Sequence, residues 1–294
     1  MPNYQSSSVE SARKAVAARL REVRLDAGLK GHELAARCGW NKSKVSRIEN
    51  AKTSPSDGDV RDWCEACEAG VQAADIIAAS RTAHSMYMEW KRLQRTGLRR
   101  LQESRIPLYE RTKLLRGYAS HVVPGLLQTP AYASALLSVI SRFHSTPNDT
   151  PEAVAARMAR ARVLHAAGHR FTLLVEESVL RFQLGNEEAM AGQLGHLLSV
   201  MSLPAVSLGV IPFSARERTM WTLEGFNIFD DRRVHVELLT AQVTLTAPSE
   251  VAMYVRAFTE LRELAVYGAT ARALVTGAID ALRWKLPCNN VELD

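Results

Sequence analysis

The sequence predicts an α+β protein, in which an all-α N-terminal domain precedes a larger mixed α/β domain with a small sheet. Up to about residue 70, apolar residues recur at intervals of three and four, which is typical of amphipathic helices. Beyond residue 170, short runs of β-branched and aromatic residues alternate with helical patterns. The length of 294 residues also favours two domains over one.

The first expected element is a helix over residues 11–27. Its apolar residues are spaced by four, three and four: Val16, Leu20, Val23 and Ala27. A further helix is expected over residues 56–69, where an apolar stripe contains Cys64 and Cys67 beside Val60 and Trp63. A zinc site would need two more ligands, and none lies nearby in the sequence. The two cysteines are therefore expected in the core, and we expect neither a metal nor a cofactor.

Residues 29–50 contain two short apolar-periodic segments on either side of a corner. Gly39 suits the left-handed conformation that ends a helix, and Asn41 can cap the next one by accepting a hydrogen bond from its free N–H groups. In the second segment, Val45 and Ile48 are three residues apart and share one face. Helix, glycine-containing turn and helix is the helix-turn-helix pattern.

If the apolar face of the second helix points inward, its outward face carries cations and hydroxyls, as a helix that enters the DNA major groove requires. Lys42 and Ser43 are the strongest candidates for contact because the N-terminal end of such a helix enters the groove. The residues expected to bind DNA are Lys42, Ser43, Lys44, Ser46, Arg47, Asn50, Lys52 and Lys30.

The positive charge of the chain is concentrated around this pattern. The whole protein carries a formal net charge of +6. Residues 11–55 contain eleven Lys or Arg against four Asp or Glu, an excess of +7, and five acids follow within residues 57–68. A local basic region of this kind fits a polyanionic partner, here double-stranded DNA.

These residues resemble the Cro/CI (xenobiotic-response-element) type of helix-turn-helix, which implies a lambda-repressor-like fold for the N-terminal domain. The resemblance also implies that Arg24 and Glu49 form a buried structural ion pair. One departure concerns the start of the first motif helix. The family usually has Ser or Thr followed by Gln there, whereas this chain has Lys30 and Gly31.

Residues 122–133, VVPGLLQTPAYA, resemble the VPGLLQTxxYA motif of an actinobacterial domain of unknown function that often follows this type of helix-turn-helix. Together the two resemblances cover nearly the whole chain. They imply roles in development or secondary metabolism and, in an antitoxin-like arrangement, a small acidic partner protein.

The second half is expected to contain helices, short strands and a hairpin. The helix over residues 150–168 has Thr150 as its expected cap, and Asn186 is expected to cap the helix that follows to residue 201. Strands are expected at 171–176, 206–211, 225–229, 234–239 and 243–245, and closing helices at 248–267 and 270–285. We divide the chain into a helix-turn-helix domain (1–75), a helical connector (76–110) and an α/β regulatory and dimerisation domain (111–294).

Two groups of residues leave alternatives open. Residues 81–116 hold ten Lys or Arg against three Glu, which indicates either a solvated connector or an extension of the DNA contact. Several large apolar residues indicate core, a dimer or partner surface, or an effector pocket: Met220, Trp221, Phe226, Phe229, Tyr254 and Phe258.

The sequence favours a regulator over an enzyme, because it has no P-loop, dinucleotide-binding glycines, nucleophile elbow or His-Glu-x-x-His pattern. We expect a homodimer on an inverted-repeat operator, whose second domain senses a small-molecule effector or a partner protein. The alternative is an antitoxin-like module that mainly sequesters a small protein. Without an apolar leader or an apolar run of ~18 residues, a cytoplasmic protein with no membrane partner is expected, on the nucleoid when bound to DNA.

Overall fold

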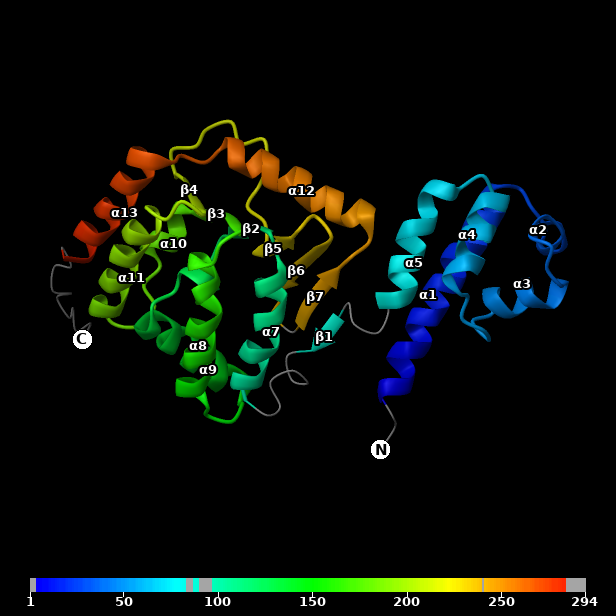
Figure 1. Ribbon diagram of the computed structural model, residues 1–294, viewed down its shortest axis with the longest axis horizontal. Helices are drawn as coiled ribbons and strands as arrows, with labels where there is room; N and C mark the ends of the chain where they lie inside the picture. Colours follow the sequence, from blue (N-terminus) through cyan, green and yellow to red (C-terminus); the bar gives the residue numbers. More distant parts are fainter. Residues whose placement is uncertain (1–3, 83–86, 90–96, 240, 284–294) are drawn as a thin grey trace, which may run out of the picture. The chain divides into compact units, whose positions relative to one another are not determined.

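The computed structural model describes residues 4–82, 87–89, 97–239 and 241–283 of the chain. It divides into two compact units (Figure 1). The first contains Met1–Tyr87 and Val243–Met253, and the second contains Met88–Gln242 and Tyr254–Asp294. The first is helical over most of its length and the second is mixed, so the predicted α+β class is confirmed. None of the helices in the described ranges is long and apolar enough to cross a membrane.

The first unit is built around the long helix α1. Its elements are α1 (Tyr4–Asp26), α2 (Gly31–Arg37), α3 (Lys42–Glu49), α4 (Asp57–Ala66), η1 (Gly70–Gln72) and α5 (Ala73–Thr82). The predicted apolar stripe of α1 is buried: Leu20 and Val23 pack with Trp63 of α4, whose indole N–H donates to the Leu20 carbonyl oxygen at 3.0 Å. Cys64 and Cys67 are buried in the same core as free thiols, and burial raises the pKa of both.

The strands form a sheet with the order β1-β7-β6-β5-β2-β3-β4, in which β6, β5, β2, β3 and β4 lie wholly within the second unit. The strands are β1 (Tyr87–Glu89), β2 (Leu114–Ala119), β3 (Arg170–Glu176), β4 (Val206–Ile211), β5 (Phe226–Phe229), β6 (Arg233–Glu237) and β7 (Ala241–Leu245). β2, β3 and β4 are parallel, while β5 runs antiparallel to both β2 and β6. The sequence did not predict β2, although it is an interior strand, paired with β5 on one side and β3 on the other.

Helices pack around this sheet. They are α7 (Arg99–Arg111), η2 (Gly125–Leu127), α8 (Pro130–His144), α9 (Thr150–Ala161), η3 (Arg162–His165), α10 (Glu177–Arg181), α11 (Glu187–Val200), α12 (Pro248–Glu263) and α13 (Gly268–Arg283). α9 packs against α7 and α8, and α11 packs against α13 (Figure 1). The expected cap by Asn186 is present: its side chain accepts from the Ala189 N–H at 2.9 Å.

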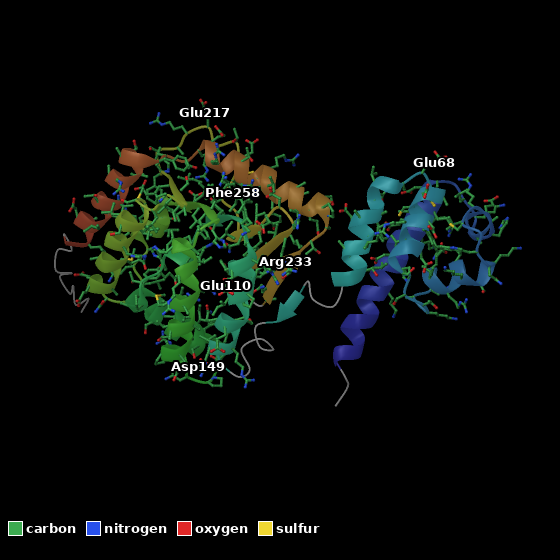
Figure 2. The ribbon with its side chains drawn as sticks, in the orientation of Figure 1. Glu68, Glu110, Asp149, Glu217, Arg233 and Phe258 are labelled. Atoms are coloured by element: carbon green, nitrogen blue, oxygen red, sulfur yellow. The ribbon has the colours of Figure 1, made fainter. Side chains whose placement is uncertain are left out.

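The helix expected over residues 150–168 needs correction at both ends. Asp149, and not Thr150, occupies the cap position, and the α-helix ends at Ala161, where the 3₁₀ turn η3 begins. The Asp149 carboxylate instead accepts from the N–H groups of Leu98 and Arg99, at 2.8 and 2.9 Å, where α7 begins (Figure 2). A negative side chain in this position satisfies free donors of α7 and opposes the positive end of its dipole.

Candidate nucleic-acid interface

Helix α3 is held in place by its cap and by its apolar face. The Asn41 side chain accepts a hydrogen bond from the Ser43 N–H at 3.0 Å, as the sequence suggested. Val45 and Ile48 are 2% and 1% exposed and pack into the core of the first unit. Gly39 has φ +65° in the turn before α3, a backbone conformation that glycine adopts without steric cost.

An ion pair between Arg24 and Glu49 connects α1 to the C-terminal end of α3. The Arg24 guanidinium donates from Nε and Nη2 to the two Glu49 carboxylate oxygens, at 2.6 and 3.1 Å. Its Nη1 donates to the Leu29 carbonyl oxygen at 2.6 Å. The Arg24 and Glu49 side chains are 9% and 14% exposed. The two hydrogen bonds to Glu49 fix the C-terminal end of α3 against α1, and the third connects α1 to the segment that leads into α2.

Four of the predicted contact residues share the exposed face of α3. Lys42, Ser43, Ser46 and Arg47 are all exposed. Within the ranges that the structure describes, no ion pair involves Lys42 or Arg47. Both charges on this face therefore point into solvent, opposite the buried Val45 and Ile48.

The Lys44 side chain of α3 does not belong to this exposed face. Its ammonium group is 2.5 Å from the Asp59 carboxylate oxygen of α4 and 3.9 Å from the centre of the Trp40 ring. Burial raises the pKa of Asp59, but hydrogen bonds from Lys44 and Ser56 lower it, and the net shift is downward. The structure thus separates Lys44 from the other predicted residues of α3, because its charge already has a partner within the domain.

The remaining predicted residues flank α3. The Asn50 side chain donates from Nδ2 to the Ser46 carbonyl oxygen at 2.7 Å and so closes the end of the helix. Lys52 is exposed, and its backbone N–H donates to the Arg47 carbonyl oxygen at 2.9 Å. Lys30 is exposed at the start of α2.

The unusual start of α2 is satisfied by Glu33. The Glu33 carboxylate accepts from the Lys30 N–H at 2.6 Å, and this hydrogen bond lowers the pKa of Glu33 together with nearby cations. Glu33 therefore satisfies a backbone donor where the family resemblance implies a Ser or Thr cap. The Lys30 side chain makes no capping hydrogen bond, which leaves its charge at the surface.

Other cations of the basic region have hydrogen-bond partners within the first unit. Arg19 donates to Gln72 at 2.8 Å and pairs with Glu22 at 3.2 Å. Arg37 donates to the Ala66 carbonyl oxygen at 2.8 Å, at the C-terminal end of α4. Arg19, Arg37, Arg24 and Lys44 thus all have partners within the first unit. The cations that remain exposed on α3 and its two flanks are Lys30, Lys42, Arg47 and Lys52.

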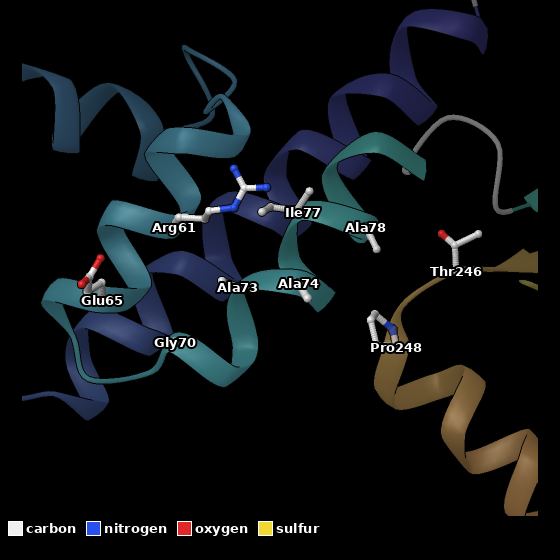
Figure 3. Close-up of a pocket in the computed structure, with 9 residues that line it drawn as sticks. All are labelled: Arg61, Glu65, Gly70, Ala73, Ala74, Ile77, Ala78, Thr246 and Pro248. Carbon is white, nitrogen blue, oxygen red and sulfur yellow. The ribbon is translucent and has the colours of Figure 1, made fainter. Parts of the chain in front are cut away.

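A pocket of the first unit lies apart from this surface. It is lined by residues of α4, η1 and α5 and by Thr246 and Pro248 of the segment Val243–Met253 (Figure 3). Next to it, the Ser249 N–H donates to the Asp75 carboxylate at 3.1 Å. None of the predicted DNA-binding residues lines this pocket.

The large apolar residues considered for an effector pocket do not form one group. Phe226, Phe229 and Phe258 are 1–3% exposed and belong to the core (Figure 2 labels Phe258). Trp221, in contrast, is 70% exposed. The Tyr254 hydroxyl donates to the Glu224 carboxylate at 2.7 Å.

Two buried arginines lie outside the predicted site. Arg157 and Arg160 are 7% and 3% exposed on α9. Together with the buried Ala153 and Ala156 they form a stripe at i, i+3, i+4 and i+7, the pattern of a buried helix face. This spacing is visible in the sequence and could have identified both arginines as buried.

Two family profiles match the chain. The one described as a domain of unknown function (DUF5753) covers residues 108–277, which is more than half of the chain. The one described as a helix-turn-helix domain covers residues 15–75 and so includes α2, α3 and α4. No curated protein and no solved structure matches the sequence.

Proposed function

The chain belongs to the DUF5753 family of unknown function and carries a helix-turn-helix domain, and on this basis we propose that it is a sequence-specific DNA-binding transcriptional regulator. The observation that carries the proposal is the exposed face of α3. Lys42, Ser43, Ser46 and Arg47 lie there together, on a helix fixed from behind by the Arg24–Glu49 pair. A rigid helix with donors on its free face suits the reading of base edges in the major groove.

In this proposal α3 is the recognition helix of a Cro/CI-type domain. Its N-terminal end, with Lys42 and Ser43, enters the major groove, and Arg47 contacts a base edge or a phosphate one turn later. Lys30 and Lys52 on the flanks contact phosphates, for which charge and reach are sufficient. Asn50 supports the helix end and contacts the backbone of the DNA. Lys44 contributes through the packing of α3 on α4.

We propose a homodimer on an inverted-repeat operator. One recognition helix reads few base pairs, and proteins with this motif gain specificity when two helices reach half-sites about one helical turn apart. The second unit is the candidate for the dimer contact and for sensing an effector. The proposal includes no catalytic activity and places the protein in the cytoplasm, on the nucleoid when it is bound to DNA.

The proposal is tested by selection from random-sequence duplexes with the full chain. The expected result is an enriched inverted repeat with half-site centres about 10 base pairs apart, bound by two chains. Sedimentation of the complex gives this stoichiometry. The absence of any enriched sequence would contradict sequence-specific binding, and one chain per site would contradict the dimer.

The alternative is an antitoxin-like module that sequesters a small protein. It is favoured by two large apolar side chains in the loop between β4 and β5, Phe213 and Trp221, which are 69% and 70% exposed. Exposed aromatic residues are enriched where proteins contact one another. No binding of duplex DNA at ~50 mM salt, where contacts with phosphate are strong, would favour this alternative.

A further inference from the structure

The second unit contains a cavity of about 580 Å³. Its walls come from β2, β5, β6, α7, α8 and α9, and from the segment around the VPGLLQT motif, namely residues 122–126 and Gln128. All of its lining residues belong to the second unit. The volume lies within the range of about 300–1,000 Å³ that is usual for small-molecule sites.

Three arginines line this cavity, and its lining includes one carboxylate. The arginines are Arg105 of α7 and Arg157 and Arg160 of α9. The carboxylate is Glu237, whose Oε1 lies 2.9 Å from Arg105 Nη2. The Glu237 side chain is 54% exposed. Within the described ranges Arg157 and Arg160 form no ion pair, although Glu237 attracts both charges from a greater distance. The three positive charges therefore share one carboxylate.

Neutral amides hold the other two guanidinium groups. The Gln102 side-chain oxygen accepts from Arg157 Nε at 3.2 Å and from Arg160 Nη1 at 3.0 Å. The Gln128 side-chain oxygen accepts from Arg157 Nη1 at 2.5 Å. Arg160 Nε is buried and has no hydrogen-bond partner within the ranges that the structure describes. The amides orient the arginines but do not neutralise them.

Leaving these charges uncompensated is costly for the folded protein. Burial, together with the neighbouring Arg160 and Arg105, lowers the pKa of Arg157 to about 9. Burial also lowers the pKa of Arg160. A guanidinium keeps its proton at neutral pH, so both side chains are charged. A buried charge without a counter-charge destabilises the folded state, and an anion placed between the two would remove this cost.

The rest of the cavity is shaped for a ligand with an apolar part. Leu136 and Ile140 of α8 and Phe226 of β5 are among its lining residues. On the side of the arginines, a Cβ atom added to Gly125 would lie 3.0 Å from Arg160 Nη2. Glycine at this point of the motif therefore allows the loop to approach the guanidinium closely.

We propose that this cavity binds a small molecule with one anionic group, a carboxylate or a phosphate, held by Arg157 and Arg160, and with an apolar body against Leu136, Ile140 and Phe226. Arginine suits this role because its planar fork donates to two oxygens of such a group at once. The inference rests on the proposed function, in which the ligand is the effector of the regulator.

The test uses two fluorescent probes of similar shape and the full-length protein. Anilinonaphthalene sulfonate is anionic, whereas N-phenylnaphthylamine lacks the charge. We expect one anion per chain and at least about tenfold weaker binding of the uncharged probe, the factor expected for hydrogen bonds to a charged group. Inorganic phosphate should compete with the anion. Equal binding of the two probes, or no binding of the anion, would overturn the proposal.

Matched variants locate the site. Arg160→Gln should weaken binding of the anion at least about tenfold and leave the uncharged probe within about twofold. Arg162→Gln removes the same charge from an exposed position two residues away and should leave both probes unchanged. Leu136→Trp fills the apolar part of the cavity without touching an arginine and should weaken both probes. If Arg160→Gln does not fold, as judged by circular dichroism, this third variant still decides, because unchanged binding would place the probes elsewhere.

The same preparations separate this inference from the proposed function. Binding of the full chain to duplex DNA is measured with and without the anionic probe. DNA binding without anion binding would overturn the ligand site alone. Anion binding that depends on Arg160, without DNA binding, would overturn the proposed function and leave the ligand site in place.

Discussion

Two groups of basic side chains in this protein have opposite surroundings. On α3, Lys42 and Arg47 project into solvent from a helix whose other face is buried. In the second unit, Arg157 and Arg160 are almost fully buried and held by the amide oxygens of glutamine. The residue types are similar, but their freedom to move and their hydration differ.

The difference indicates two kinds of anion recognition. Exposed cations bind a polyanion through many weak, hydrated contacts, which salt screens and which release counterions. Buried arginines are already desolvated and oriented, so they suit one small anion at a defined place. Net charge alone, +6 for the whole chain, does not distinguish these two cases, since burial decides between them.

The largest expected effect concerns Arg24, a buried cation that has a carboxylate partner. Arg24→Ala should lower the free energy of unfolding by about 3–5 kcal/mol, because it leaves Glu49 mostly buried and unpaired. Denaturant unfolding followed by circular dichroism measures this change. Arg19→Ala is the control, since the Arg19–Glu22 pair is 54% and 59% exposed and should contribute under about 1 kcal/mol. Unchanged stability in Arg24→Ala would place this residue among the surface cations.

Part of this contrast could be predicted from the sequence. The fold class and the helix-turn-helix follow from periods of three and four residues, from Gly39 and from the Asn41 cap, which are all local signals. The burial of Arg157 and Arg160 is also encoded locally, by their spacing with alanines on α9. The ion pair of Lys44 is not, because its partner Asp59 lies on another helix.

The interior strand β2 shows why parts of the sheet were harder to predict from the sequence. Leu114–Ala119 contains Arg116 and Gly117 and no β-branched residue, so its composition does not indicate a strand. It is fixed by pairing with β3 and β5, which are separated from it in the sequence. A Cβ atom on Gly117 would lie 2.8 Å from the Leu173 side chain and 2.9 Å from the Asn227 side chain, so any larger residue would displace them. This constraint is visible only in the folded structure.

A smaller effect is expected for Arg47 at the DNA surface. Arg47→Ala should weaken binding to the selected operator by about 1–3 kcal/mol and relax specificity at one position, if the guanidinium reads a guanine. Fluorescence anisotropy with the operator and with single-base variants measures both quantities. Lys52→Ala is the comparison and should weaken binding to all of these duplexes alike. Unchanged affinity in Arg47→Ala would show that the outward face of α3 is not the reading face.

The smallest effect concerns Lys44 and pH. The folded protein holds the pKa of Asp59 below its ordinary value, so this carboxyl stabilises the fold at pH values above its unfolded pKa. The contribution is lost as pH falls through the folded pKa, that is, below about pH 4. Lys44→Met should therefore show a shallower loss of stability in this range than the parent. Parallel pH profiles would mean that Lys44 does not stabilise the Asp59 carboxylate.

The most direct test of DNA binding through α3 is the salt dependence of affinity for one duplex, measured for the parent and three variants. Each lost phosphate contact lowers the slope of log affinity against log salt by about 1. Lys42→Ala should lower the slope by about this amount, and Arg47→Ala should do so if it contacts a phosphate. Lys44→Met should leave the slope unchanged, because Asp59 already pairs with its charge. A lower slope in Lys44→Met with unchanged slopes in both α3 surface variants would contradict this account and place the DNA on another face of the domain.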